Sequence, residues 1–210
     1  MMCSWRLVNK MAVARKEHRM IPTLRHFAYI ATLLSVAVSH GRAQGKPIAI
    51  TNMIVDYAER PTALGPAVAS ASAVVVGRIR DMRNYLPPQN GATVRTMYTL
   101  DVAEVIHSEW PLSQSINVFR YGGDIDEGVR VKRIVESDFP AFMPGREYVM
   151  FLLWNNILNG FELKFGADSA YEVMPNGTIT THGRSRLAHA QSGRSAAAMI
   201  ADLKKEAVGR

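Results

Sequence analysis

The apolar positions follow a helical pattern near both ends of residues 44–210 and a strand-like pattern between them. The stretch "PTALGPAVASASA" (61–73) is rich in alanine behind a proline, which predicts a short helix over 62–70. At the other end, "SGRSAAAMIADLKKEAVGR" places apolar side chains on one stripe of a helix that Ser192 or Ser195 would cap.

Between these helices, β-branched runs alternate with turns that are rich in Gly, Pro and Asn, which is typical of strands. Neither face of the run at 94–108 is apolar throughout, which predicts a bulge near Ala103. The run at 148–154 is continuously apolar and is expected to be the central strand, buried on both faces. Asn159-Gly160 and Asn176-Gly177 are typical hairpin turns. The predicted strands lie in 73–82, 94–108, 115–122, 129–137, 148–154, 156–165, 170–174 and 178–182.

These elements predict a mainly β (α+β) fold, a small closed or partly closed barrel with a short N-terminal helix and a C-terminal helix. We expect a lead-in segment at 44–61, the barrel domain at 62–185, and a C-terminal helix and tail at 186–210.

The N-terminal 43 residues have the pattern of an export signal. Arg25 and His26 precede 12 mostly apolar residues, "FAYIATLLSVAV", which are fewer than the roughly 20 that a spanning helix needs. Small residues then favour cleavage after Ala43, with Ser39 as the alternative. A permanent membrane anchor is a second interpretation of the apolar run. Met20 would be the true start if the signal has ordinary length. The sequence therefore predicts a periplasmic or secreted protein that meets the membrane only during export.

The charge and the cysteine count narrow the function. The formal net charge is +7, but residues 1–43 hold seven of the 25 Lys and Arg and a single acid, so the remainder carries 18 basic and 17 acidic residues. A nearly neutral exported domain argues against nucleic acid as a partner. The one cysteine, Cys3, precedes the apolar run. After cleavage the chain would have no disulfide, thiolate zinc site or cysteine nucleophile.

Four motifs carry a resemblance to known proteins. The order "ASASAVVVGRI", "YTLDVAEVIHS", "INVFRYGG" and "FMPGREYVMFL" resembles a family of uncharacterised exported bacterial β-rich domains, over about residues 62–180. It is distantly similar to the netrin-module and tissue-inhibitor-of-metalloproteinase type of OB barrel, which implies an OB-like barrel here. The N-terminal cysteine and the disulfides of those inhibitors are missing, so metalloproteinase inhibition is not implied.

The stretch "RYGGDIDEGVR" (120–130) concentrates acidic residues between glycines. Asp124, Asp126 and Glu127 could bind a cation weakly, but their spacing does not match the EF-hand loop. Adjacent carboxylates on one loop are also poorly arranged as a catalytic pair. We therefore interpret the stretch as a solvated turn between two strands, with a weak cation loop as the alternative.

No other catalytic or cofactor motif is present in the sequence. His107, His182 and His189 lack the spacing of a metal site, and no serine lies in G-x-S-x-G. We find no P-loop or dinucleotide fingerprint, and we expect no cofactor and no metal.

A binding face is the remaining candidate site. Basic residues on neighbouring strands would form a groove for an anionic partner if they share one face, and Trp154 at the rim could add binding energy. The simpler interpretation is the polar face of a sheet and a core-capping tryptophan. The basic residues are Arg78, Arg80, Arg83, Arg120, Arg130 and Lys132.

The sequence thus predicts a non-enzymatic exported domain that binds a protein, peptide or glycan of the cell envelope. A hydrolase with dispersed catalytic residues and a structural or assembly component of the envelope are the alternatives.

Overall fold

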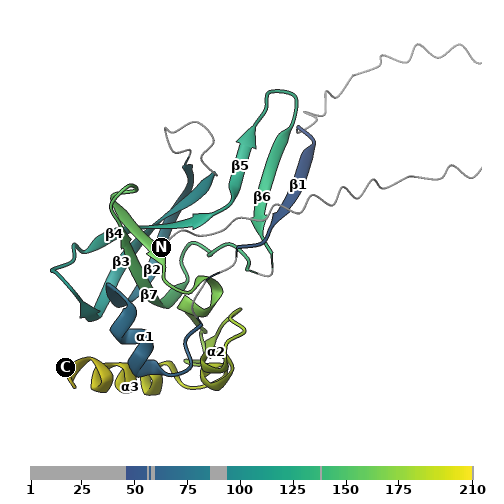
Figure 1. Ribbon diagram of the computed structural model, residues 1–210. Helices are drawn as coiled ribbons and strands as arrows, with labels where there is room; N and C mark the ends of the chain where they lie inside the picture. The colour runs from purple at the N-terminus through teal and green to yellow at the C-terminus, as the bar shows by residue number, and fades with distance from the viewer. Residues whose placement is uncertain (1–45, 56, 58–59, 86–93, 138, 210) are drawn as a thin grey trace, which may run out of the picture.

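Strands dominate the computed structural model, which describes residues 46–55, 57, 60–85, 94–137 and 139–209 (Figure 1). The predicted export segment, with its cleavage site after Ala43, lies outside these residues. The elements in chain order are β1 (Ile48–Met53), α1 (Leu64–Ser70), β2 (Ala73–Tyr85), β3 (Arg95–Ser108), β4 (Ser115–Tyr121), β5 (Gly123–Asp126), β6 (Val131–Glu136), β7 (Glu147–Asn155), β8 (Gly160–Leu163), the 3₁₀ turn η1 (Gly166–Ser169), β9 (Ala170–Val173), β10 (Ile179–Thr180), α2 (Arg186–Gln191) and α3 (Ala196–Val208).

The larger sheet partly closes on itself. Its order is β10-β9-β7-β2-β3-β4-β8, and β7 pairs with β8 as well as with β2 and β9. Strands β2, β3, β4, β8 and β7 therefore form a circuit, which we call the five-strand circuit. Its β4–β8 contact is parallel and covers two residue pairs, Val118 with Phe161 and Phe119 with Glu162. The mainly β fold that the sequence predicted is therefore confirmed.

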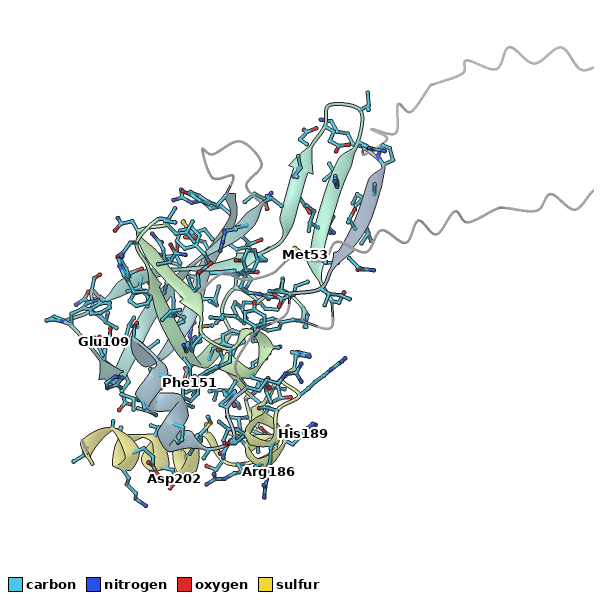
Figure 2. All side chains as sticks on the ribbon, viewed as in Figure 1. Met53, Glu109, Phe151, Arg186, His189 and Asp202 are labelled. Atoms are coloured by element: carbon cyan, nitrogen blue, oxygen red, sulfur yellow. The ribbon has the colours of Figure 1, made fainter. Side chains whose placement is uncertain are left out.

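Strand β2 is apolar on both faces because two cores meet on it. Val75 and Ile79 pack inside the five-strand circuit. Val74 and Val76 instead pack on the outer face, with Phe151 and with the helices α1 and α3 (Figure 2). Burial on both sides explains the unbroken "AVVV" run, because no position there alternates toward water.

The bulge predicted near Ala103 is confirmed. Val76 pairs with Glu104 and Gly77 pairs with Val102, so Ala103 has no partner on β2. One extra residue on one strand is the definition of a bulge, and it bends the long β2–β3 pair.

A second sheet projects from the first, with order β1-β6-β5 (Figure 1). The chain crosses from β4 of the larger sheet to β5 of this one through Gly122 and Gly123, which have φ values of +98° and +144°. A Cβ at Gly122 would lie 2.6 Å from the carbonyl oxygen of Ile134, so this crossing requires glycine. The sequence patterns predicted only a lead-in segment at 44–61, and β1 lies within it. The interpretation of 120–130 as a solvated turn was wrong for Gly123–Asp126, which form β5, so the turn is confined to the residues that follow Asp126.

The helices differ from the prediction at their starts. Helix α1 begins at Leu64 and not at residue 62, with Pro66 in its first turn, where an N–H needs no acceptor. Ser195 is the N-cap residue of α3, while Ser192 ends α2, a helix that the sequence analysis did not predict. No helix in the described ranges is long and apolar enough to cross a membrane.

Candidate functional site

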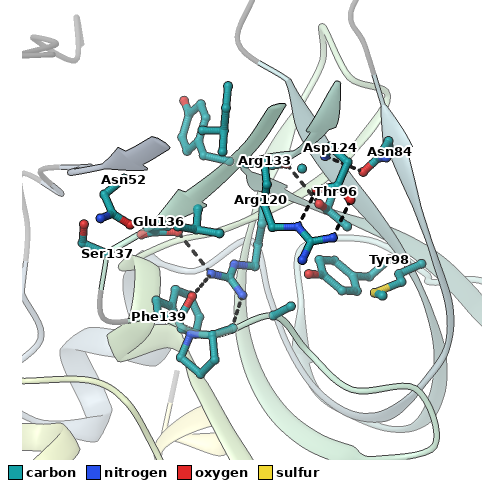
Figure 3. A pocket seen from close by; sticks show the side chains of 18 of the residues that line it. Asn52, Asn84, Thr96, Tyr98, Arg120, Asp124, Arg133, Glu136, Ser137 and Phe139 are labelled. Atoms are coloured by element: carbon teal, nitrogen blue, oxygen red, sulfur yellow. Dashed lines mark hydrogen bonds and ion pairs between the residues drawn. The ribbon is translucent and has the colours of Figure 1, made fainter. Parts of the chain in front are cut away.

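A cleft of about 1060 Å³ lies between the small sheet and one end of the five-strand circuit (Figure 3). Its floor continues the inner face of the circuit. Thr96 and Arg120 pair with each other and lie two residues along their strands from the core residues Tyr98 and Val118, and therefore on the same face. The small sheet and the segment after β6 form the walls. The lining residues are Asn52, Met82, Arg83, Asn84, Thr96, Tyr98, Arg120, Tyr121, Gly122, Gly123, Asp124, Arg133, Ile134, Val135, Glu136, Ser137, Phe139, Pro140, Ala141, His182 and Arg184.

Arg120 joins the two sheets beneath this cleft. Its Nη1 donates to the Pro140 carbonyl oxygen at 2.6 Å, and its Nη2 donates to the Phe139 carbonyl oxygen at 2.7 Å. The same Nη2 lies 3.4 Å from Oε2 of Glu136, and the guanidinium carbon lies 3.6 Å from the centre of the Phe139 ring. Figure 3 shows the guanidinium group held between these partners. Both charged residues are buried, with Arg120 5% and Glu136 8% exposed.

Burial dominates the electrostatics of this network. Desolvation raises the pKa of Glu136, while the charge of Arg120 and hydrogen bonds from Arg120 and Tyr57 oppose the rise. Burial also raises the pKa of Tyr57, and the nearby carboxylate of Glu136 adds to this shift. Arg120 directs its Nη donors to the wall segment and to Glu136, and its Nε is buried without a partner among the described residues. Arg120 therefore fixes the shape of the cleft and does not present an exposed cation to a ligand.

A second ion pair fixes the wall that the small sheet provides. Arg133 on β6 binds both carboxylate oxygens of Asp124 on β5 at 2.7 Å, which lowers the pKa of Asp124. Oδ1 of Asn84 accepts a hydrogen bond from the backbone N–H of Asp124 at 3.1 Å. The small sheet is thus tied to the end of β2 as well as to β4.

The polar side chains that a ligand would meet include uncharged amides and hydroxyls as well as two arginines. Asn52, Asn84 and His182 are exposed, and Thr96 and Ser137 are half-buried. Arg83 and Arg184 also line the cleft and are exposed. Amides, hydroxyls and an imidazole offer both hydrogen-bond donors and acceptors. Their mixture with the apolar surfaces of the cleft suits a polar organic ligand better than a bare ion.

Two smaller cavities adjoin the same walls. One has a volume of about 260 Å³ and the other about 230 Å³, and both share Phe139 and His182 with the main cleft. The segment that contains Phe139 therefore separates the main cleft from both neighbouring cavities, and the bonds from Arg120 hold this partition in place.

The structure scatters the basic residues that the sequence analysis grouped on one face. Arg78 pairs with Glu147 and Arg80 pairs with Asp101, outside the cleft. Arg83 lines the cleft and places Nη2 3.7 Å from the sulfur of Met97. Arg120 also lines the cleft but is buried.

The other predicted binding residues lie elsewhere. Arg130 pairs with Glu127 in the β5–β6 turn, and Lys132 lies on β6. Trp154 lies near the start of β2, at the opposite end of that strand from the cleft, and contacts Trp110 and Phe161 edge-on at 5.9 and 5.1 Å between ring centres.

The three carboxylates of the proposed cation loop each contact a basic side chain. Asp124 pairs with Arg133 and Glu127 with Arg130, as above, and Asp126 accepts two bonds from Nζ of Lys46 at 2.8 and 2.6 Å. The described part of the chain contains no group of three or more His, Cys, Asp and Glu side chains placed to hold a metal ion.

The predicted histidines separate in the same way. His107 is half-buried on β3, and His189 is exposed on α2, far from the small sheet at whose base Met53 lies (Figure 2). Of the three, His182 lines the cleft. Glu136, Tyr57 and Asn84 were missed, because each takes its role from a partner that is distant in the sequence.

No family model matches the chain, and a search of the curated proteins finds no significant match.

Proposed function

We propose that this protein is an exported, non-enzymatic binding domain, periplasmic or secreted, whose cleft takes a protein segment, peptide or glycan of the cell envelope. The observation that carries the proposal is the cleft of about 1060 Å³, whose walls are fixed by buried charges of the chain itself. Its volume is at the upper end of ligand sites, which are about 300–1,000 Å³, and it leaves room for a peptide or a short glycan.

We infer that the five-strand circuit is an OB-like barrel. In chain order its strands are β2, β3, β4, β7 and β8. Around the circuit, β2 is followed by β3, β4, β8 and β7, so the fifth strand of the chain lies between the third and the fourth. The third and fifth are parallel and the other neighbours antiparallel. This order supports the OB-like interpretation, and the mouths of such barrels are frequent ligand sites.

A preformed cleft favours binding because little has to be ordered when the ligand arrives. The Arg120 network and the Asp124–Arg133 pair hold two walls before any ligand is present. Association then loses less conformational entropy than it would with flexible walls.

Capture of envelope partners from the native host tests the proposal. The protein, expressed with its own N-terminal segment and a C-terminal affinity tag, would be cross-linked in cells, and the captured molecules identified by mass spectrometry. Met82→Trp would fill part of the cleft from an exposed wall position. Met143→Trp is the matched control, because Met143 has similar exposure, 58% against 51%, and does not line the main cleft.

We expect one reproducible peptide, protein or glycan partner that Met82→Trp loses and Met143→Trp keeps. Equal capture by both variants would place the partner elsewhere and reject the cleft as the site. N-terminal sequencing of the exported protein tests the localisation separately, with Gln44 expected as the first residue.

A further inference from the structure

Strand β1 forms the outer edge of the small sheet, and no described strand pairs with that edge. Its inner edge pairs in parallel with β6 along its whole length, from Ile48 with Val131 to Met53 with Glu136. The outer edge is therefore six residues long, and no register shift interrupts the strand.

The register fixes which backbone groups point outward. The N–H of Val131 donates to the carbonyl of Pro47 at 3.0 Å, and that of Ser137 to the carbonyl of Met53 at 2.8 Å. Since the N–H and C=O of one strand residue point to the same side, the odd-numbered residues of β1 face β6. Ile48, Ile50 and Asn52 then direct their backbone groups away from the sheet.

The same three residues have exposed side chains. Ile48 is 53% exposed and Ile50 is 65% exposed, which is unusual for isoleucine on a sheet. Native sheets protect such edges with charged residues, proline or a bulge. Strand β1, "IAITNM", contains no charged residue and no proline, and its pairing with β6 has no register shift.

We propose that β1 pairs with β1 of a second copy of this protein, antiparallel and symmetric about Ile50. In this register, Ile50 faces Ile50 of the second copy. Ile48 of each copy faces Asn52 of the other. The outward N–H and C=O groups of all three residues are then satisfied. The two small sheets become one six-stranded sheet with an isologous, two-fold interface.

Side-chain chemistry favours the second copy as the occupant. The exposed isoleucines gather at the seam, where directly opposed and diagonal side chains are close enough to contact. The nearest charge on this face is Arg133, next to Ile50 on β6, and its guanidinium is bound to Asp124. Two copies of Arg133 would be separated by both Ile50 residues, so like charges do not oppose each other across the seam.

Association of this kind is expected to be weak. One strand pair buries less than the roughly 1,200–2,000 Å² of a standard stable interface. The dimer should therefore be reversible, and its fraction should rise with protein concentration.

Sedimentation velocity of the exported protein tests the proposal. The wild type should move from monomer toward dimer as its concentration rises. Ile50→Lys and Ile50→Glu should each remain monomeric, because like charges would meet at the two-fold axis. A mixture of these two variants should recover the dimer, since the opposite charges face each other. Val129→Lys is the control, because Val129 is 83% exposed on the turn of the same sheet and should leave association unchanged.

Cross-linking tests the register directly. In a Cys3→Ser background, Ile50→Cys places two thiols on residues whose Cα atoms are about 5.5 Å apart, which suits a disulfide. It should oxidise to a covalent dimer, and Val129→Cys should not. A wild type that stays monomeric at every concentration, or a mixture of the charged variants that stays monomeric, would overturn the proposal.

Discussion

The substitution Arg120→Met tests whether one buried side chain holds the cleft together. Methionine keeps much of the aliphatic length of arginine but removes every hydrogen bond of the guanidinium group. The carbonyls of Phe139 and Pro140 then lose donors at 2.7 and 2.6 Å, and Glu136 loses its cationic partner.

The expected loss of stability is large for one substitution. A buried acceptor left without a donor costs about 1–3 kcal/mol, and removing one partner of a buried ion pair costs about 3–5 kcal/mol. These effects overlap, because Glu136 can take up a proton and become neutral. We therefore expect the free energy of unfolding to fall by about 3–5 kcal/mol at neutral pH.

Urea unfolding followed by circular dichroism measures this change. Arg83→Met is the matched control, because Arg83 also lines the cleft but is exposed and makes no ion pair among the described residues. The control should change stability by less than about 0.5 kcal/mol. A loss below about 1 kcal/mol for Arg120→Met would refute the structural role that we assign to Arg120.

Three single substitutions test other parts of the structure. Burial raises the pKa of Glu136 above its ordinary 4.5, so its protonated form favours the folded state below about pH 4.5, and this contribution is lost as pH rises through the folded pKa. In urea titrations, the stability of the wild type relative to Glu136→Gln should therefore fall as pH rises from about 4.5. The buried hydroxyl of Tyr171 finds no hydrogen-bond partner in the described ranges, so Tyr171→Phe should raise the thermal midpoint, by an amount equivalent to about 1 kcal/mol. Gly122→Ala should destabilise by about 2 kcal/mol or more, and by more than Gly128→Ala, because both glycines have positive φ but a Cβ at Gly128 would meet nothing within 4 Å; equal losses in urea unfolding would contradict the close approach at Gly122.

Local patterns in the sequence were enough to locate most strands of the larger sheet. The Asn176-Gly177 turn joins β9 to β10, with φ of +78° at Gly177, as its turn type requires. The mixed alternation of the second strand predicted its bulge. These features depend on neighbours in the sequence, which is why a single sequence reveals them.

The small sheet depends on contacts that no local pattern records. Strand β1 is parallel to β6, a strand some 80 residues further along the chain. The sequence of β1 has no clear period, and neither of its faces is buried. Strand β5 is four residues long and acidic, with Asp124 neutralised by Arg133 across the hairpin. Pairing therefore overrides the weak strand propensity of aspartate in β5.

The candidate site left one signal that the sequence analysis did not use. In "SINVFRY", Ile116, Val118 and Arg120 fall on one face by strict alternation, so Arg120 replaces an apolar residue on a buried face. A charge at such a position requires buried partners. The sequence could have predicted a structural arginine at this point, but not that Glu136 and the Phe139 and Pro140 carbonyls are its partners.

Photo-cross-linking from inside the cleft shows directly whether the cleft at the end of the five-strand circuit takes an envelope ligand. A photoreactive phenylalanine analogue would replace Met82 on the cleft wall, or Met143 as the exposed control, in protein exported by the native host. We expect a specific covalent adduct from position 82 and none from position 143. Adducts of equal yield from both positions, or no adduct from position 82, would contradict this expectation.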